Sequence, residues 1–230
     1  MGQASCAGLQ QELFDLLSIR THVTSYTRDV NVAATPEDDV SPEELQFIFR
    51  SDRLCLAFCA TVGERWRRGF ERLRSPADLV RWYAEARVTD VPVAVTGEDL
   101  DSAREVREAV YRAAKALTVG QPPAAVDETI VNWAAAVPPP VPWMNQGAVT
   151  LTAAGPDPAA SALSAVARDA IALFTTEDVR RLRECASPEC GLLFLDLSRP
   201  GRRRWCSSGA CGGKARAAAY RQRRASTSAH

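Results

Sequence analysis

Four cysteines near the end of this 230-residue chain constrain its fold more than any other feature. They form two pairs of the type Cys-x4-Cys, and fifteen residues separate the pairs. Two close thiol pairs joined by a short insert are typical of a four-thiolate zinc site, because each tight turn supplies two ligands. The sequence therefore predicts one zinc ion bound by Cys185, Cys190, Cys206 and Cys211.

The residues between and after the pairs predict the structure of this module. The apolar run 192–197 predicts a buried strand, Ser198 to Gly201 a turn, and 202–205 a returning strand. The alanine-rich segment from Lys214 to Arg224 favours a helix. A knuckle, a hairpin and a helix that carries the last ligand are the parts of a treble-clef-like zinc finger, which we expect at residues 177–224.

The chain resembles a known family at these residues. The resemblance rests on Cys190-Gly191-x-x-Phe194-x-Asp196 and Arg203-Arg204-Trp205-Cys206-Ser207, followed by Cys211-Gly212 and Tyr220-Arg221-x-Arg223. These motifs are similar to the CGNR zinc finger, which follows an ABATE domain in bacterial proteins. The Cys-Gly-Asn-Arg tetrad that names the finger reads Cys211-Gly212-Gly213-Lys214 here. The resemblance reaches back to about residue 45 and implies a stress-induced transcription regulator.

Charge is distributed unevenly along the chain. Its 28 basic and 28 acidic residues balance, but nine Lys or Arg and no acid lie from Arg199 onward. This asymmetry favours a C-terminal end that binds a polyanion. The alternative is charge compensation, because a zinc ion with four thiolates carries a formal charge of about −2.

If the partner is double-stranded DNA, we expect one group of residues to contact the bases and another group to contact the phosphates. Arg216, Tyr220 and Arg223 share one face of the expected helix, and arginine can bind guanine edges in the major groove. Phosphates would be held by five other basic side chains. These are Arg202, Arg203, Arg204, Lys214 and Arg224.

The rest of the chain predicts an α+β protein, with a predominantly helical body at residues 45–176 and one short β-hairpin. Capping patterns start helices at Ser75 and Thr96, and Pro158 opens another. Residues 148–152 alternate as a strand, with 141–144 as the expected partner. We expect Val126, Ile130 and Trp133 to face the core, Arg107 to face solvent, and Cys55 and Cys59 to be core residues.

Residues 1–44 predict a flexible extension in which Leu9, Leu13, Leu16 and Leu17 could form one helical face, and 225–230 a tail. The chain has no run of 18 apolar residues and its start lacks the pattern of a secretory signal, so a cytoplasmic protein is expected. The only histidines are His22 and His230, and no catalytic motif accompanies them, which predicts no enzyme. A protein–protein adaptor, an unrecognised enzyme, a homodimer and a small-molecule effector stay open.

Overall fold

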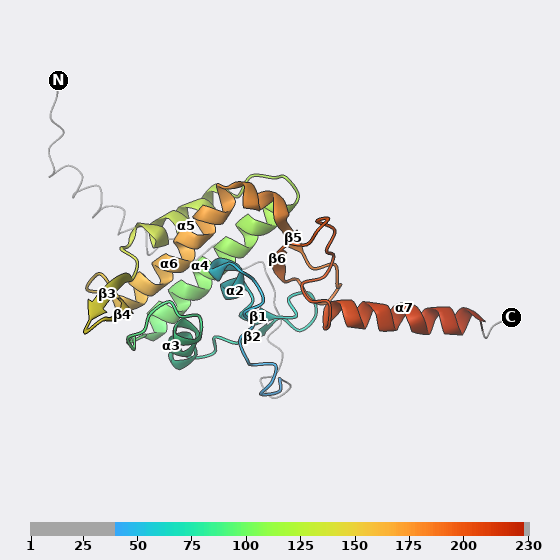
Figure 1. The fold of residues 1–230 in the computed structure, drawn as a ribbon, viewed down its shortest axis with the longest axis horizontal. Coiled ribbons are helices and arrows are strands. Elements are labelled where there is room, and N and C mark those ends of the chain that lie inside the picture. The colour runs from blue at the N-terminus through green and yellow to red at the C-terminus, as the bar shows by residue number, and fades with distance from the viewer. Residues whose placement is uncertain (1–39, 228–230) are drawn as a thin grey trace, which may run out of the picture. The chain divides into compact units, whose positions relative to one another are not determined.

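The computed structural model describes residues 40–227 of the protein (Figure 1). Its body is built from helices α2 (Leu54–Cys59), α3 (Pro76–Glu85), α4 (Gly97–Thr118), α5 (Ala125–Ala136) and α6 (Pro158–Phe174). The N-terminal leucine face and the greater part of the predicted extension lie outside the described residues. No helix in the described range is long and apolar enough to span a membrane.

The helix starts follow the predicted caps. The Thr96 hydroxyl accepts a hydrogen bond from the Asp99 amide at 3.2 Å, and the Asp99 carboxylate accepts from the Thr96 amide at 2.8 Å. Asp157 caps α6 in the same way, since its carboxylate accepts from the Ala160 amide at 2.9 Å. Each cap satisfies amides that the first helical turn leaves without partners.

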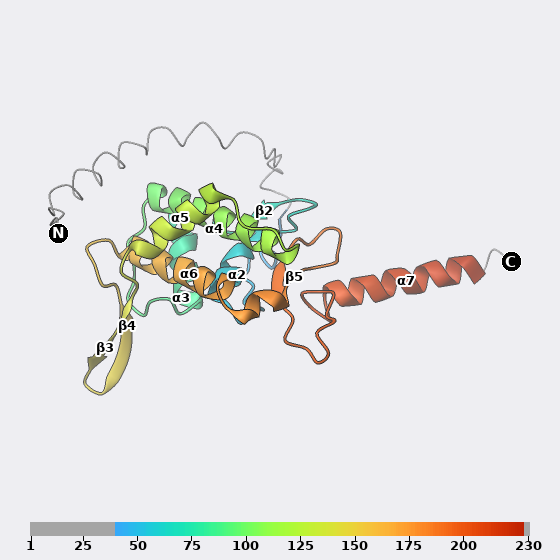
Figure 2. The ribbon, with the colours of Figure 1, turned by 90° about the horizontal axis from the view of Figure 1, so that it is seen from above.

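Three small antiparallel sheets accompany the helices. Strand β1 (Val62–Gly63) pairs with β2 (Phe70–Glu71), and β3 (Val141–Asn145) pairs with β4 (Ala148–Thr152) as the sequence predicts. The hairpin β3–β4 stands out from the helices, as Figure 2 shows. After α6, the 3-10 helix η4 (Glu177–Arg181) leads into β5 (Leu182–Glu184), which pairs with β6 (Leu193–Leu195). The last element is α7 (Cys211–Thr227).

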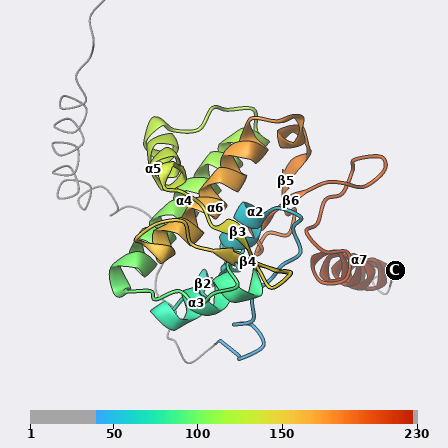
Figure 3. The same cartoon turned by 60° about the vertical axis from the view of Figure 1, so that its left-hand side comes forward.

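Helix α4 lies at the centre of the core, with α2, α5 and α6 around it (Figures 1 and 3). The predicted stripe on α4 is confirmed, because Val106, Ala109 and Val110 are buried. Arg107 corrects the prediction that it faces solvent. Its side chain is only 4% exposed, and its guanidinium lies 2.8 Å from the Glu71 carboxylate. A buried arginine is tolerated here because carboxylates of neighbouring elements neutralise it.

The predicted inner face of α5 is also wrong. Val126 and Trp133 are 58% and 53% exposed, whereas Ile130 is half-buried and packs against the core. The buried side chains are Val131, Ala135 and, unexpectedly, Asp127. Arg112 of α4 donates to the Asp127 carboxylate from Nε at 2.9 Å. This ion pair turns the Asp127 side of α5 toward α4 and leaves Trp133 outside.

The finger is joined to the body at β5 and β6. Leu182, Leu193 and Leu195 are buried in the same cluster as the helices of the body. The returning strand predicted at 202–205 does not form. The Arg203 amide donates to the Asp196 carboxylate at 2.8 Å, and the Arg204 carbonyl accepts from the Ala186 amide at 2.8 Å. Strand β6 instead pairs with β5, which lies directly before Cys185 in the chain.

Residue 191 at this junction requires glycine, which yields a testable prediction. Gly191 has φ +66°, and a Cβ added there would lie 2.8 Å from the Arg65 Cβ. Gly201 has a similar φ of +74°, but a Cβ there would have open space. Gly201→Ala should lower the free energy of unfolding by about 1 kcal/mol through backbone strain alone. Gly191→Ala should lower it by at least about 2 kcal/mol, because steric overlap adds to the strain.

Denaturant unfolding of the zinc-loaded protein measures both values, with Gly201→Ala as the matched control. Equal losses for the two variants would mean that the body does not pack closely against residue 191.

Candidate metal centre

The four C-terminal cysteines converge on one point between the β5–β6 sheet and the start of α7. Their Sγ atoms all lie within 4.8 Å of one another. The Sγ of Cys206 lies 3.7 Å from that of Cys190 and 3.7 Å from that of Cys211. Four sulfurs bound tetrahedrally at about 2.3 Å from one zinc ion would be about 3.8 Å apart. The two 3.7 Å spacings match this geometry, and since all four sulfurs lie within 4.8 Å of one another, none would need to approach another by more than about 1 Å to bind one zinc ion.

The protonation of these thiols supports a cation at the centre. Hydrogen bonds from Cys190 and Cys206 lower the pKa of the Cys185 thiol, and backbone amides assist. The same proximity raises the pKa of Cys190 and of Cys206. One thiolate is thus readily formed, but further thiolates would repel it at this distance. A divalent cation removes the repulsion, which is why such a cluster suits zinc and not a set of free thiols.

Asp196 and Arg203 support the second cysteine pair. Asp196 is buried, and hydrogen bonds from Ser198 and from the Arg203 amide lower the pKa of its carboxyl. The Arg203 guanidinium donates from Nε to the Trp205 carbonyl at 2.8 Å and also donates to the Cys206 carbonyl. It lies 4.8 Å from the centroid of the Phe194 ring. Arg203 therefore braces the turn that carries Cys206.

The other basic residues predicted to contact DNA are more accessible. Arg216 donates to the Ser208 carbonyl at 2.9 Å, and the guanidinium of Arg224 lies 5.9 Å from the centroid of the Tyr220 ring. Helix α7 extends away from the helical body (Figures 1 and 2). The exposed members of the predicted set are Arg202, Arg204, Lys214, Arg216, Tyr220, Arg223 and Arg224.

Cys55 and Cys59 are core residues, as predicted. They are 0% and 2% exposed, and burial raises the pKa of both thiols. The Cys55 amide donates to the Asp169 carboxylate at 2.9 Å, which fixes the start of α2. Neither thiol belongs to the metal cluster, since that cluster comprises four other cysteines.

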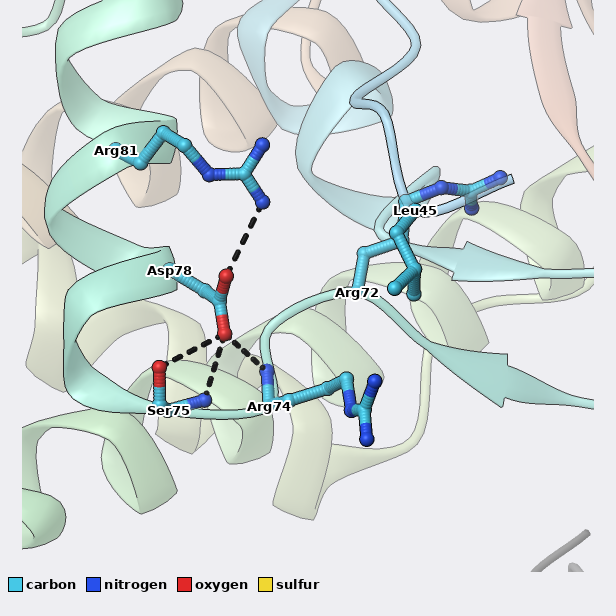
Figure 4. Close-up of a pocket in the computed structure, with 6 residues that line it drawn as sticks. All are labelled: Leu45, Arg72, Arg74, Ser75, Asp78 and Arg81. Carbon is cyan, nitrogen blue, oxygen red and sulfur yellow. Dashed lines mark hydrogen bonds and ion pairs between the residues drawn. The ribbon is translucent and has the colours of Figure 1, made fainter. Parts of the chain in front are cut away.

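A separate pocket of about 400 Å³ lies at the start of α3 (Figure 4). Arg74, Ser75 and Arg81 all donate to the Asp78 carboxylate there. Arg72 also lines the pocket, but its guanidinium donates to the carbonyls of Glu44 and Ala60. The Asp78 carboxylate and the Arg72 guanidinium of this pocket thus already have partners within the protein. The metal cluster remains the better candidate for a functional site.

The contacts that join finger and body could not be found from the sequence. The Arg65 amide donates to the Cys190 carbonyl at 3.3 Å, and the Tyr111 hydroxyl donates to the Gly191 carbonyl at 2.9 Å. The Arg65 guanidinium lies 3.9 Å from the centroid of the Tyr111 ring. Trp66 donates to the Glu184 carboxylate at 2.7 Å. These partners are far apart in the chain. The only local signal in the sequence that another part of the chain packs closely here is the glycine after Cys190.

Comparison with protein families agrees with this site. Residues 52–177 match the ABATE family, described as "Putative stress-induced transcription regulator", and residues 181–224 match the CGNR zinc finger. The first match covers more than half of the chain. No protein with a curated description matches the chain. The family match and the clustered thiols together confirm the predicted zinc finger.

Acidification should release the metal. Zinc binds the deprotonated thiols, so protons compete with it and the affinity falls as the pH falls. Because proximity raises the pKa of Cys190 and Cys206, this competition should begin above the range in which carboxylates titrate. Zinc release into a chromophoric indicator, measured between about pH 8 and pH 5, checks the expected sign. A zinc content that does not change over this range would contradict thiolate ligation.

Arg203→Ala should weaken zinc binding by about 10- to 100-fold, as expected for a residue that orients a metal ligand. Arg202→Ala is the matched control, because Arg202 is its exposed neighbour. Zinc affinity and the visible spectrum of the cobalt-substituted protein report on the geometry of the site. Equal zinc affinities for the two variants would show that Arg203 does not support the site.

Proposed function

Because the chain belongs to the ABATE family, whose description is "Putative stress-induced transcription regulator", we propose that it is a zinc-dependent regulator that binds double-stranded DNA through its C-terminal finger. The helical body would sense a signal or mediate dimerisation. In this proposal the body comprises residues 45–176 and the finger residues 177–224. The single observation that carries the proposal is the basic surface of residues 199–224, a segment that contains no acidic residue.

The location of the charges supports this proposal over charge compensation. Compensation of the thiolates requires arginine near the sulfurs, and Arg203 meets that need from inside the finger. The other basic residues of the finger and of α7 are exposed. No acidic residue occurs after Asp196, so nothing in this part of the sequence offsets their charge. Such a field attracts the phosphate backbone of DNA and gives salt-dependent binding.

The order of the elements supports a treble-clef architecture for the finger. The first cysteine pair flanks a turn next to β6, and α7 begins at the last ligand, Cys211. In this proposal, Arg216, Tyr220 and Arg223 lie on one face of α7 and approach the base edges. Arg202, Arg204, Lys214 and Arg224 would contact phosphates. Arg203 is the exception within the predicted set, because it is half-buried whereas the other members are exposed.

A protein–protein adaptor with a purely structural zinc ion is the second candidate. Its support is the apolar surface of the hairpin and of α5. Trp143 and Met144 are 65% and 76% exposed, and Trp133 is 53% exposed. Scattered apolar side chains are normal on a surface, whereas large exposed ones concentrated in one hairpin favour a protein partner. An adaptor need not bind DNA, so a measurement of DNA binding distinguishes the two candidates.

DNA binding should weaken steeply with salt. The slope of log affinity against log salt should be about −0.9 for each phosphate contacted. Arg202→Ala should weaken binding to all duplexes alike and reduce that slope by about one contact. Arg81→Ala, an exposed arginine of the body, is the control and should change neither quantity. Fluorescence anisotropy with a labelled random duplex measures both, and an absence of binding at low salt would favour the adaptor.

A further inference from the structure

The two ligand pairs of the zinc finger belong to mechanically different parts of the chain. Cys185 and Cys190 flank the turn between β5 and β6, whose leucines are buried in the core of the body. Cys206 and Cys211 lie in a loop and at the start of α7. Within residues 40–227, no residue after Leu195 belongs to the main hydrophobic core.

The body holds the first pair through bonds that do not involve a metal. Arg65 and Tyr111 donate to the carbonyls of Cys190 and Gly191. The Arg65 guanidinium is itself fixed, because it donates to both oxygens of Glu108 at 2.8 and 3.1 Å. These donors come from the β1–β2 turn and from α4, so the first knuckle is attached to the helical core on two sides.

The second pair has a different environment. Its apolar contacts form a small cluster around the sulfurs, in which Phe194 and Trp205 take part. Arg203 and Arg216 make internal bonds to carbonyls of residues 205, 206 and 208. A backbone hydrogen bond joins this segment to the first knuckle, from the Ala186 amide to the Arg204 carbonyl. The Arg203 amide also donates to the Asp196 carboxylate at 2.8 Å, and the Cys206 amide donates to the Cys185 sulfur at 3.4 Å. Because each side supplies two of the four thiols, an ion bound by all of them would add the strongest link between this segment and the first knuckle.

We propose that the zinc finger divides at Asp196 into a fixed part and a metal-dependent arm. Residues 182–195 belong to the body and keep their fold without metal. Residues 197–227 form an arm that carries the basic surface, and its position depends on all four thiolates sharing one ion. Metal loading would thus control whether α7 is presented in a fixed orientation. This regulatory consequence rests on the proposed DNA binding, whereas the division of the finger does not.

Hydrogen exchange of the full-length protein tests the division directly. Amide exchange is measured by mass spectrometry with zinc bound and after removal of zinc by a chelator under reducing conditions. Peptides from 182–195 and from α4 should keep their protection. Peptides from 203–216 should exchange faster by on the order of tenfold or more, because local opening no longer requires release of the ion. Added zinc should restore the original pattern.

Two outcomes would overturn the proposal. Loss of protection in 182–195 together with 203–216 would show that the finger unfolds as one unit. Unchanged protection in both would show that the arm is held without the metal. Cys190→Ser and Cys211→Ser form a matched pair, with one ligand removed from each half, and both should reproduce the pattern of the chelated protein. The chelation experiment decides the question if Cys190→Ser fails to fold.

DNA binding is measured separately on the same samples. If the arm presents the basic surface, chelation should weaken binding to a duplex by about tenfold or more while the body remains folded. Equal affinity with and without zinc would overturn the regulatory part. If the zinc-loaded protein binds no DNA, the proposed function fails, and the exchange pattern still decides whether the arm exists.

Discussion

The docking of the first knuckle on the body is the interaction on which the finger depends. Two carbonyls at consecutive positions, Cys190 and Gly191, accept hydrogen bonds from the β1–β2 turn and from α4. A buried carbonyl without a partner would be costly, so both the knuckle and its donors must keep their places. The absence of a side chain at residue 191 lets the two surfaces touch. Two sulfurs are thereby positioned in advance for an ion.

This preorganisation gives the two ends of the protein different characters. The acidic part contributes a helical core in which arginines such as Arg107 are neutralised by carboxylates. The basic part, from Arg199 onward, contains no acidic residue. Its basic side chains are exposed to solvent, except that Arg203 is half-buried beside the metal centre. Separation of this kind lets one end bind a polyanion without repulsion from the other, provided that the junction is rigid. The knuckle contacts fix the first cysteine pair to the body.

The sequence was most informative where structure is local. Cysteine spacing identified the metal cluster, and the Thr96 and Pro158 patterns placed helix starts, because caps and knuckles are decided within a few residues. It failed where a distant partner decides the outcome. Asp127 turned α5 because Arg112 of α4 lies opposite. The predicted return strand is also missing, and β6 pairs with β5, a strand that was not predicted from the sequence.

Trp66 gives this junction an optical property. Its indole lies under the Lys115 ammonium, 3.9 Å from the ring centroid, and donates to Glu184 just before the first cysteine. It is one of five tryptophans, and Trp82 is fully buried in the core. A charged neighbour and a hydrogen-bonded indole both alter the emission of tryptophan. The junction between the two ends of the molecule therefore carries one of the five tryptophans, and its emission contributes to the fluorescence of the unlabelled protein.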